Sequence, residues 1–365
     1  MEVVGNFVIW QFCNLGSCSA SRTSPNYPIT KLPNYQMDLI FCGTPQFAVP
    51  ALQALTNDAA GHRVRLVVTQ PDRPSGRGME LSVPPVKQLA QRLGLEVTQP
   101  EKIKNNLEFR ARLEEIRPEA IVVVGYGRII PQWMIELPPL GNINLHGSLL
   151  PKYRGAAPVQ WAIASGETVT GVTTMRIDAG LDTGDMLLQR ETPIAAEDTA
   201  VTLAPRLAEM GAPLMVETLA GLKAGTITPR KQDDAQATLA PILKKEDGLI
   251  DFRRSARQIW NRLRGFQPWP VAYTTFRGKN LNVWAAMPVE ESGVRSQESA
   301  VAPGELSVDK DRLFVLCGER TVLEVLTVQP EGKKRMAARD FVHGYHPRSG
   351  ERLGTDEHGD TEARR

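Results

Sequence analysis

The sequence is poor in cysteine and histidine, and both shortages limit the chemistry that it can carry. Its 365 residues include four cysteines and five histidines. Cys13 and Cys18 lie near each other but have no matching pair downstream, which argues against a disulfide framework and a zinc ribbon. Free cysteines of this kind predict a reducing, cytoplasmic compartment.

The chain also lacks long apolar runs and a strong net charge. No run approaches the roughly 18 apolar residues that a membrane-spanning helix needs, so we expect no membrane insertion. The net charge is only +2, so a nucleic-acid partner can be indicated only by local charge asymmetry. The hydrophobic fraction of 42% is ordinary for a soluble globular protein, and the length favours two domains.

The first 36 residues lack the periodicity of the chain that follows. They show neither a sustained helical or strand period nor the pattern of a signal peptide. We therefore interpret residues 1–36 as a disordered leader or as a mis-assigned start before Met37. The divisions predicted after the leader are a catalytic domain at 37–227, a linker at 228–246, a second domain at 247–347 and a disordered tail at 348–365.

Short apolar strands alternate with helical stretches from Met37 onward. Because their apolar runs are continuous, these strands are typical of a parallel sheet that is covered on both faces. Beyond residue 246, an arginine-rich helix precedes short strands punctuated by glycine and proline, which favours a small barrel. The predicted fold class is therefore α/β, with a parallel-rich sheet followed by a small β-barrel domain. The first strands are expected at 39–42, 66–68, 121–124 and 143–146.

Asn144 and His146 are the first candidates for catalytic side chains. They lie two residues apart on an expected strand, so their side chains share one face, roughly 6.5–7 Å apart along it. The strand ends at Gly147, and open parallel sheets bind ligands beyond the carboxyl ends of their strands. An amide donor beside an imidazole suits oxyanion stabilisation and proton transfer. The alternative is structural: Asn144 ties down a loop, and His146 is a hydrogen-bonded core residue.

Three aspartates, Asp178, Asp182 and Asp185, occur on one glycine-rich segment. Their spacing does not fit a calcium loop, and neither HExxH nor paired cysteines accompany His146, so we expect no metal. The segment is also compatible with a plain turn, because Asp and Gly favour turns for local reasons. The glycine turns of the first domain complete neither G-x-G-x-x-G nor a Walker loop, which argues against NAD and ATP.

Two parts of the chain have the composition of a nucleic-acid contact. The loop at 69–78 carries Arg73 and Arg77 among glycine and proline, which suits an exposed lid that contacts phosphate. Residues 241–290 contain nine lysines and arginines against four acidic residues, which suits a grip on an RNA backbone. In both places the alternative is a solvated surface with no partner. The candidates that we select from the second region are Lys244, Lys245, Arg262 and Arg264.

Several segments together resemble the methionyl-tRNA formyltransferase family, from Met37 to about Gly344. Residues 144–151 contain the His-x-Ser-Leu-Leu-Pro signature of folate-dependent formyltransferases. The runs at 154–158 and 268–270 are more particular to the tRNA enzymes. The other matching runs lie at 41–48, 69–74, 153–160, 180–186 and 261–270.

The resemblance implies a Rossmann-like catalytic domain and an OB-like C-terminal barrel. It also implies transfer of a formyl group from 10-formyltetrahydrofolate to the α-amino group of initiator methionyl-tRNA, without a metal. We expect the enzyme to be a monomer. The resemblance assigns catalysis to Asn144, His146 and Asp182, folate binding to Ser148, Leu149, Leu150 and Pro151, and a contact with the acceptor end of the tRNA to Arg77.

One departure and two alternatives accompany this interpretation. The family often has lysines after the lid arginine, whereas Met79 and Glu80 follow Arg77 here, so this lid is less basic. A formyl-folate enzyme with the same core could instead act on glycinamide ribonucleotide or hydrolyse the formyl group, but neither activity explains the basic region after residue 246. A non-catalytic RNA-binding relative would need a gap in the catalytic residues, and all three are present.

Overall fold

The computed structural model describes residues 36–57, 61–75, 80–289 and 302–354. All but the last residue of the predicted leader lies outside these ranges, as do Arg77 and the end of the predicted tail. Within these ranges, no helix is both long enough and apolar enough to cross a membrane.

The first residues of the predicted tail belong to the folded C-terminal domain. Leu353 is 4% exposed, and its backbone N–H donates to the carbonyl of Gly304 at 2.9 Å. Residues 348–354 are therefore part of that domain, and a tail can begin only after them.

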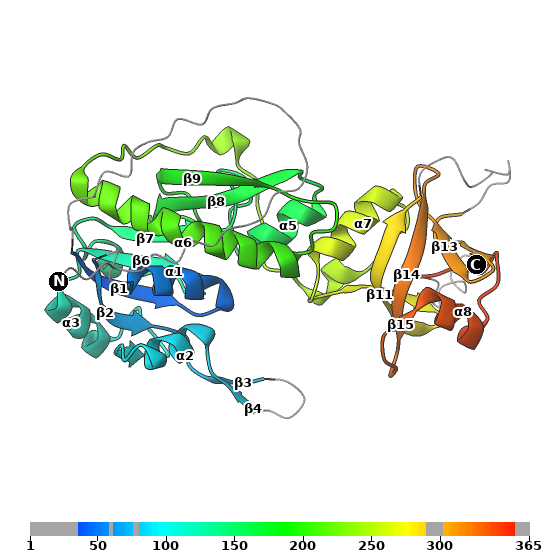
Figure 1. The fold of residues 1–365 in the computed structure, drawn as a ribbon, viewed down its shortest axis with the longest axis horizontal. Coiled ribbons are helices and arrows are strands. Elements are labelled where there is room, and N and C mark those ends of the chain that lie inside the picture. Colours follow the sequence, from blue (N-terminus) through cyan, green and yellow to red (C-terminus); the bar gives the residue numbers. More distant parts are fainter. Residues whose placement is uncertain (1–35, 58–60, 76–79, 290–301, 355–365) are drawn as a thin grey trace, which may run out of the picture. The chain divides into compact units, whose positions relative to one another are not determined.

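A seven-stranded sheet forms the centre of the N-terminal domain, in the order β5-β2-β1-β6-β7-β8-β9 (Figure 1). The first five strands in that order run parallel, and β8 and β9 run antiparallel at one edge. In β1, Leu39 and Phe41 pack on one side and Ile40 and Cys42 on the other, so both faces are buried as the apolar runs predicted. The strands are β1 (Asp38–Gly43), β2 (Arg63–Val68), β5 (Val97–Thr98), β6 (Ala120–Val124), β7 (Asn142–His146), β8 (Val169–Arg176) and β9 (Met186–Pro193).

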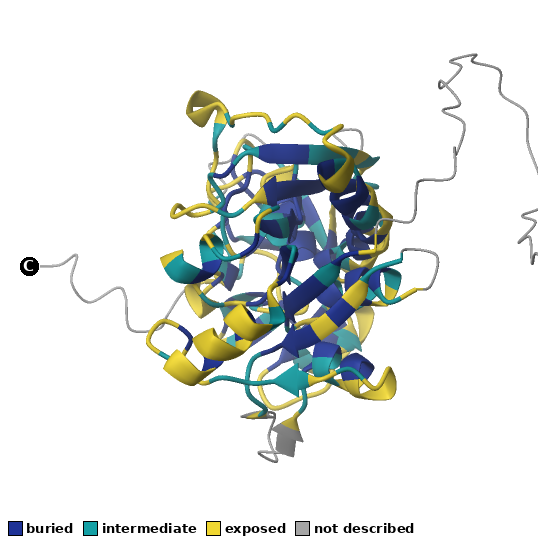
Figure 2. Cartoon of the chain, turned by 90° about the vertical axis from the view of Figure 1, so that its left-hand side faces the viewer, coloured by how far each residue is buried: buried dark blue, intermediate teal, exposed yellow. Residues whose placement is uncertain are grey.

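Two groups of helices cover the sheet. Helices α1, α2, α5 and α6 contribute to the core on one face, and α3 and α4 to the core on the other. Figure 2 shows the strands as largely buried, with exposed residues on the outer faces of the helices. These elements are η1 (Gln46–Ala48), α1 (Val49–Leu55), α2 (Pro85–Arg92), α3 (Leu107–Ile116), α4 (Gln132–Ile135), α5 (Pro158–Ala164) and α6 (Ala200–Ala224).

Helix α6 extends over 25 residues although it contains two prolines. It begins after Thr199, which forms a capping box, and ends at Gly225, whose φ of 68° is the left-handed conformation typical of a helix end. The sequence predicted a helix here that Pro205 and Pro213 make irregular. Its long buried stripe against the sheet outweighs the two lost backbone hydrogen bonds.

The predicted lid lies on a small hairpin of β3 (Arg73–Ser75) and β4 (Glu80–Ser82). At its base, Nζ of Lys87 donates to Asp72 Oδ2 at 2.7 Å and to Gln99 Oε1 at 2.6 Å. The hydrogen bond from Lys87 is the main reason why the pKa of Asp72 lies below its ordinary value. The base of the hairpin is therefore fixed to α2 and to the residues after β5.

The C-terminal domain contains a six-stranded antiparallel sheet, in the order β10-β11-β14-β13-β12 with β15 beside β14. The hairpin predicted around Arg277-Gly278 is present, and both turn residues have positive φ, 48° and 70°. Helices α7 and α8 pack on this sheet through residues such as Ile259 and Phe341. The bounds are α7 (Ala256–Gly265), β10 (Ala272–Phe276), β11 (Lys279–Pro288), β12 (Leu306–Asp309), β13 (Arg312–Leu316), β14 (Val322–Pro330), β15 (Met336–Ala337) and α8 (Ala338–Tyr345).

The first half of the predicted linker lies against the N-terminal domain. Arg230 exchanges two backbone hydrogen bonds of 2.8 Å with Met186, and the N–H of Ala240 donates to the carbonyl of Arg154 at 2.7 Å. The segment also forms two short 3-10 helices, η3 (Asp234–Gln236) and η4 (Lys245–Gly248). It is therefore fixed to the catalytic domain as far as Ala240.

Candidate active site at the end of β7

Strand β7 presents a core face and a polar face. Leu145 on the core face meets α6 at Gly211, where a Cβ would come within 2.6 Å of the leucine side chain. The opposite face carries Asn142, Asn144 and His146, because side chains alternate along a strand. The core contact holds the strand in place, and the polar face remains for chemistry.

The two asparagines on this face differ in their surroundings. Asn142 is 1% exposed, and its Nδ2 donates to the carbonyls of Met134 and Ile135 at 2.8 and 3.1 Å, which ties β7 to α4. Asn144 is half-buried, and its amide makes no hydrogen bond to any described residue. The structural role that the sequence allowed for Asn144 is thus found at Asn142, and Asn144 has hydrogen-bonding capacity to spare.

His146 is 5% exposed and is held at one ring nitrogen. Its Nε2 lies 2.8 Å from the backbone carbonyl of Tyr153. Because a carbonyl can only accept, this bond assigns a proton to Nε2. Nδ1 lies 3.7 Å from Oδ2 of Asp182, within reach of an ion pair but beyond a hydrogen bond. The ring nitrogen without a hydrogen bond to a described residue is therefore Nδ1, on the side of the carboxylate.

Asp182 comes from the turn between β8 and β9, and its side chain is 19% exposed. Its φ of 53° is the left-handed conformation, which is uncommon outside glycine. Oδ2 accepts the backbone N–H of Gly155 at 2.9 Å, so one oxygen faces both Gly155 and His146. The structure brings His146 and Asp182 together and places Asn144 on the same face of β7.

The loop after β7, predicted to bind folate, is docked on β8. Thr173 Oγ1 donates to the carbonyl of Ser148 at 2.7 Å and accepts the N–H of Leu150 at 3.1 Å. Ser148 is fully buried and Leu150 is 3% exposed, so both side chains lie inside the fold. Leu149 and Pro151 are half-buried and provide the apolar surface of this loop.

Of the six residues predicted to contact RNA, three are exposed and one lies outside the described residues. Arg73, Lys244 and Lys245 are exposed. Arg77 lies outside the described residues. The exposed cations are therefore accessible to a phosphate backbone, and their predicted contacts stay predictions.

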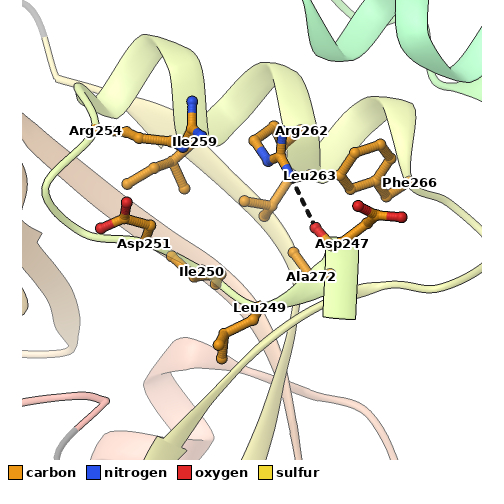
Figure 3. Close-up of a pocket in the computed structure, with 11 residues that line it drawn as sticks. Asp247, Leu249, Ile250, Asp251, Arg254, Ile259, Arg262, Leu263, Phe266 and Ala272 are labelled. Atoms are coloured by element: carbon orange, nitrogen blue, oxygen red, sulfur yellow. Dashed lines mark hydrogen bonds between the residues drawn. The ribbon is translucent and has the colours of Figure 1, made fainter. Parts of the chain in front are cut away.

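Arg262 and Arg264 instead point into the protein. Arg262 is half-buried over the ring of Phe266, and its Nη2 donates to the Asp247 carbonyl at 3.0 Å, the dashed line in Figure 3. Arg264 is 9% exposed, and its Nη1 donates to the carbonyl of Asp198 at 3.0 Å. Burial lowers the pKa of both guanidinium groups. Contact of these two residues with tRNA stays a prediction, and much of their hydrogen-bonding capacity is already used.

Comparisons with known proteins identify the family. The family model "Formyl transferase" matches residues 37–219, and "Formyl transferase, C-terminal domain" matches residues 242–346. A methionyl-tRNA formyltransferase of Koribacter versatilis is 65% identical over 318 residues, which cover 87% of this chain and 99% of the relative. The chain belongs to the methionyl-tRNA formyltransferase family. Another member, from Caldanaerobacter subterraneus subsp. tengcongensis, is 49% identical over 85% of this chain and 97% of its own.

Solved structures agree on the fold. An N-formyltransferase from Helicobacter canadensis, in complex with folinic acid and dTDP-3-aminofucose, has a TM-score of 0.57 at 17% identity, over 80% of this chain and 99% of its own. HypX from Aquifex aeolicus has a TM-score of 0.53 at 17% identity, over 85% of this chain and 49% of its own. At these identities the likeness shows the fold alone. With the family models, it confirms a Rossmann-like domain followed by a C-terminal domain with an antiparallel sheet.

Three residues of this formyltransferase that contact the predicted catalytic residues were missing from the predicted site. Tyr153 contacts His146 through its carbonyl, and Gly155 contacts Asp182 through its N–H. Both lie in the family motif at 153–160, which was the available signal. Gln232 donates to the backbone of Asp182, yet it lies in the segment interpreted as a linker, where nothing in the local pattern marks it.

Proposed function

We propose that the protein transfers the formyl group of 10-formyltetrahydrofolate to the α-amino group of initiator methionyl-tRNA, giving N-formylmethionyl-tRNA. Formylation of methionyl-tRNA follows from the family and from relatives that are 49% to 65% identical over nearly their whole length. The structural observation that carries the proposal is the His146–Asp182 pair on the same face as the Asn144 amide, which hydrogen-bonds to no described residue.

The chemistry is the transfer of an acyl group between two nitrogens. A bond forms between the formyl carbon and the methionyl nitrogen, and the bond from that carbon to N10 of the folate breaks. The methionyl amine loses a proton and N10 gains one. Negative charge develops on the formyl oxygen as the amine attacks, and fixed donors at that oxygen lower the barrier, each by about 3 kcal/mol.

We assign the two donors to the polar face of β7. The Asn144 amide has donors that no described residue uses, so it can bind the formyl oxygen without losing an existing hydrogen bond. Protonated His146 is the second donor, through Nδ1–H, because Nε2–H is bound to Tyr153 and Nδ1 makes no hydrogen bond to Asp182 at 3.7 Å. Its ring is already fixed by the 2.8 Å contact with Tyr153, so little reorganisation accompanies the reaction.

Asp182 orients and balances the charge of His146. Its Oδ2 lies 3.7 Å from Nδ1, and the Gly155 N–H fixes that oxygen. The pair is only 5% and 19% exposed, which strengthens its electrostatic interaction relative to one in water. We further assign to Asp182 a part in moving the proton that the amine loses.

The substrates meet two further surfaces. We propose that folate lies against the loop of Ser148, Leu149, Leu150 and Pro151, and that its apolar parts contact the half-buried Leu149 and Pro151. The tRNA backbone is proposed to contact the exposed Arg73, Lys244 and Lys245 and the lid residue Arg77. The same RNA contact was predicted for Arg262 and Arg264.

Three further properties are part of the proposal: a monomer, a cytoplasmic location and catalysis without a metal. Among the described residues, no three His, Cys, Asp or Glu side chains converge as ligands for a metal ion would. Sedimentation, cell fractionation and metal analysis of the purified protein test the three properties.

A formylation assay with three acceptors tests the function. Charged initiator tRNA, elongator methionyl-tRNA and glycinamide ribonucleotide are offered in parallel, and formate release is followed without an acceptor. We expect transfer to initiator methionyl-tRNA to dominate. A dominant product on glycinamide ribonucleotide, or rapid formate release, would overturn the proposal in favour of another formyl-folate enzyme.

A further inference from the structure

Gln232 uses both ends of its side-chain amide within a few ångströms of the candidate active site. Its Nε2 donates to the carbonyls of Asp182 and Gly184, each at 2.8 Å. Its Oε1 accepts the Nε–H of Arg154 at 2.9 Å. The residue is half-buried and belongs to the segment of the chain that follows α6 and precedes the C-terminal domain. One amide therefore connects three segments that are far apart in the sequence.

The two bonds from Nε2 restrain the turn that carries Asp182. Asp182 has a φ of 53°, which its surroundings must hold in place because a non-glycine residue rarely adopts it. Gly184 has no room for a side chain, since a Cβ there would lie 1.9 Å from the carbonyl oxygen of Arg176, so the turn passes close to the end of β8. Gln232 binds the backbone on both sides of Thr183, so it fixes the direction in which the Asp182 carboxylate leaves the turn.

The bond to Oε1 reaches the loop that holds the other side of the site. Arg154 lies between Tyr153, whose carbonyl binds His146, and Gly155, whose N–H binds Asp182. The Arg154 side chain is 8% exposed and also donates to Asp234 at 2.7 Å. Through Gln232, the turn of Asp182 and the loop behind His146 are therefore held by one side chain.

We propose that Gln232 is a positioning residue for formyl transfer. It sets the Asp182 carboxylate relative to His146 by holding the Asp182–Gly184 turn against the loop of Arg154. The inference rests on the proposed function, because it requires Asp182 to act on the reaction. A residue that only stabilised the fold would change the melting temperature and leave the turnover of the folded enzyme unchanged.

Gln232→Glu is the sharpest variant. It keeps the shape of the side chain and an oxygen for Arg154, but it replaces the N–H donors with an oxygen 2.8 Å from two carbonyl oxygens. We expect kcat for methionyl-tRNA to fall about tenfold or more, with the KM for both substrates within about twofold of wild type. Gln232→Met, which removes all three bonds, should lose at least as much.

Gln236→Glu is the matched control. Gln236 lies in the same segment, is exposed, and donates only to Asp233 at 2.8 Å. This variant should keep wild-type kcat. A loss equal to that of Gln232→Glu would mean that the segment tolerates no charge, and it would overturn the proposal.

A double-mutant cycle separates positioning from a general effect. If Gln232 acts through Asp182, Gln232→Met should add little to the loss already caused by Asp182→Ala. Independent, multiplying losses would overturn the inference, as would an unchanged kcat in Gln232→Glu at a normal melting temperature. An inactive wild-type enzyme would instead refute the proposed function, so the two failures are distinguishable.

Discussion

Gly211 of α6 and Leu145 of β7 are in such close contact that residue 211 has no room for a side chain. A Cβ at this position would lie 2.6 Å and 2.9 Å from the two methyl carbons of Leu145. Leu145 is 3% exposed, so it has little space into which it can move. Because its neighbours in the chain are Asn144 and His146, the depth of α6 on the sheet also sets the position of the polar face of β7, to which we assign catalysis.

Gly211→Val should therefore impair both stability and turnover. Overpacking at such a site costs about 2 kcal/mol, and a shift of β7 moves Asn144 and His146 relative to Asp182. Glu209→Val is the control, because it places the same residue at an exposed position of the same helix. Of these two variants, only Gly211→Val should have a lower melting temperature and a lower kcat. Equal effects of the two variants would mean that the helix, and not the contact with Leu145, is the sensitive feature.

The two asparagines of β7 should separate catalysis from stability. Asn144→Ala should lower kcat about 100-fold or more with little change in melting temperature. His146→Ala and Asp182→Ala should lower kcat by a similar factor. Asn142→Ala should instead destabilise the protein by about 1–3 kcal/mol, because two carbonyls lose their donor. Turnover and urea unfolding of each variant check this. Normal turnover of His146→Ala would refute the mechanism.

Much of the fold was predictable because its signals are local. Continuous apolar strands such as β6 exist only where both faces are covered, and the Arg277-Gly278 turn specifies its own hairpin. The contacts of the predicted linker could not be predicted in this way. Arg230 and Ala240 bind the catalytic domain through backbone groups, and backbone hydrogen bonds leave no mark on the choice of side chain.

The candidate site could be proposed from the sequence as far as its chemistry lies in side chains. Asn144 and His146 share a face because of the period of a strand, and the family motif added Asp182. A count of basic residues could not show that Arg264 is buried, because α7 packs against α5 as well as its own sheet. Gln232 acts from a position 50 residues after Asp182, and only the fold brings the two together.

Asp198, which lies just before α6, should make the free energy of unfolding depend on pH. Burial alone would raise the pKa of this carboxyl, but hydrogen bonds from Arg206 and from the Ala195 N–H outweigh it and lower the pKa. A depressed pKa in the folded state contributes stability that is present above the ordinary value of 3.8 and is lost as the pH falls through the folded value. Asp198→Asn should therefore be less stable than wild type at pH 7, and the difference should shrink below about pH 3.8. Urea unfolding at both pH values, with exposed Asp340→Asn as control, tests this; a gap that is constant with pH would contradict it.

Truncation should separate folate binding from tRNA binding only if the segment at 228–246 is kept. A protein that ends at residue 245 retains Arg230, Gln232 and Ala240, so we expect it to bind folate and to lose most of its affinity for tRNA. A protein that ends at residue 228 lacks these bonds and should bind folate more weakly. Fluorescence titration with folate and filter binding of tRNA measure the two affinities. Full tRNA affinity of the longer truncated protein would place the docking surface on the catalytic domain.

The lid hairpin has a fixed base, and RNA contacts are predicted for Arg73 and Arg77. Lys87, Asp72 and Gln99 fix its base, and Arg73 at the start of β3 is exposed. Arg77 lies outside the described residues, between Gly76 and Gly78. Neither neighbour offers a side chain against which its stem could pack. An arginine in such a sequence is better suited to contact a ligand than to stabilise the fold.

Arg77→Ala should therefore slow the formylation of methionyl-tRNA with little change in melting temperature or in the KM for folate. Arg77→Lys should recover only part of the loss, because a point charge replaces a planar fork. The loss should be larger at low salt than at high salt, since contacts with phosphate weaken as salt rises. Arg110→Ala is the control: it removes an exposed charge, paired with Glu114 on α3, and should leave the rate unchanged. An unchanged rate for Arg77→Ala, or a loss that only follows unfolding, would leave Arg77 without a role in binding tRNA.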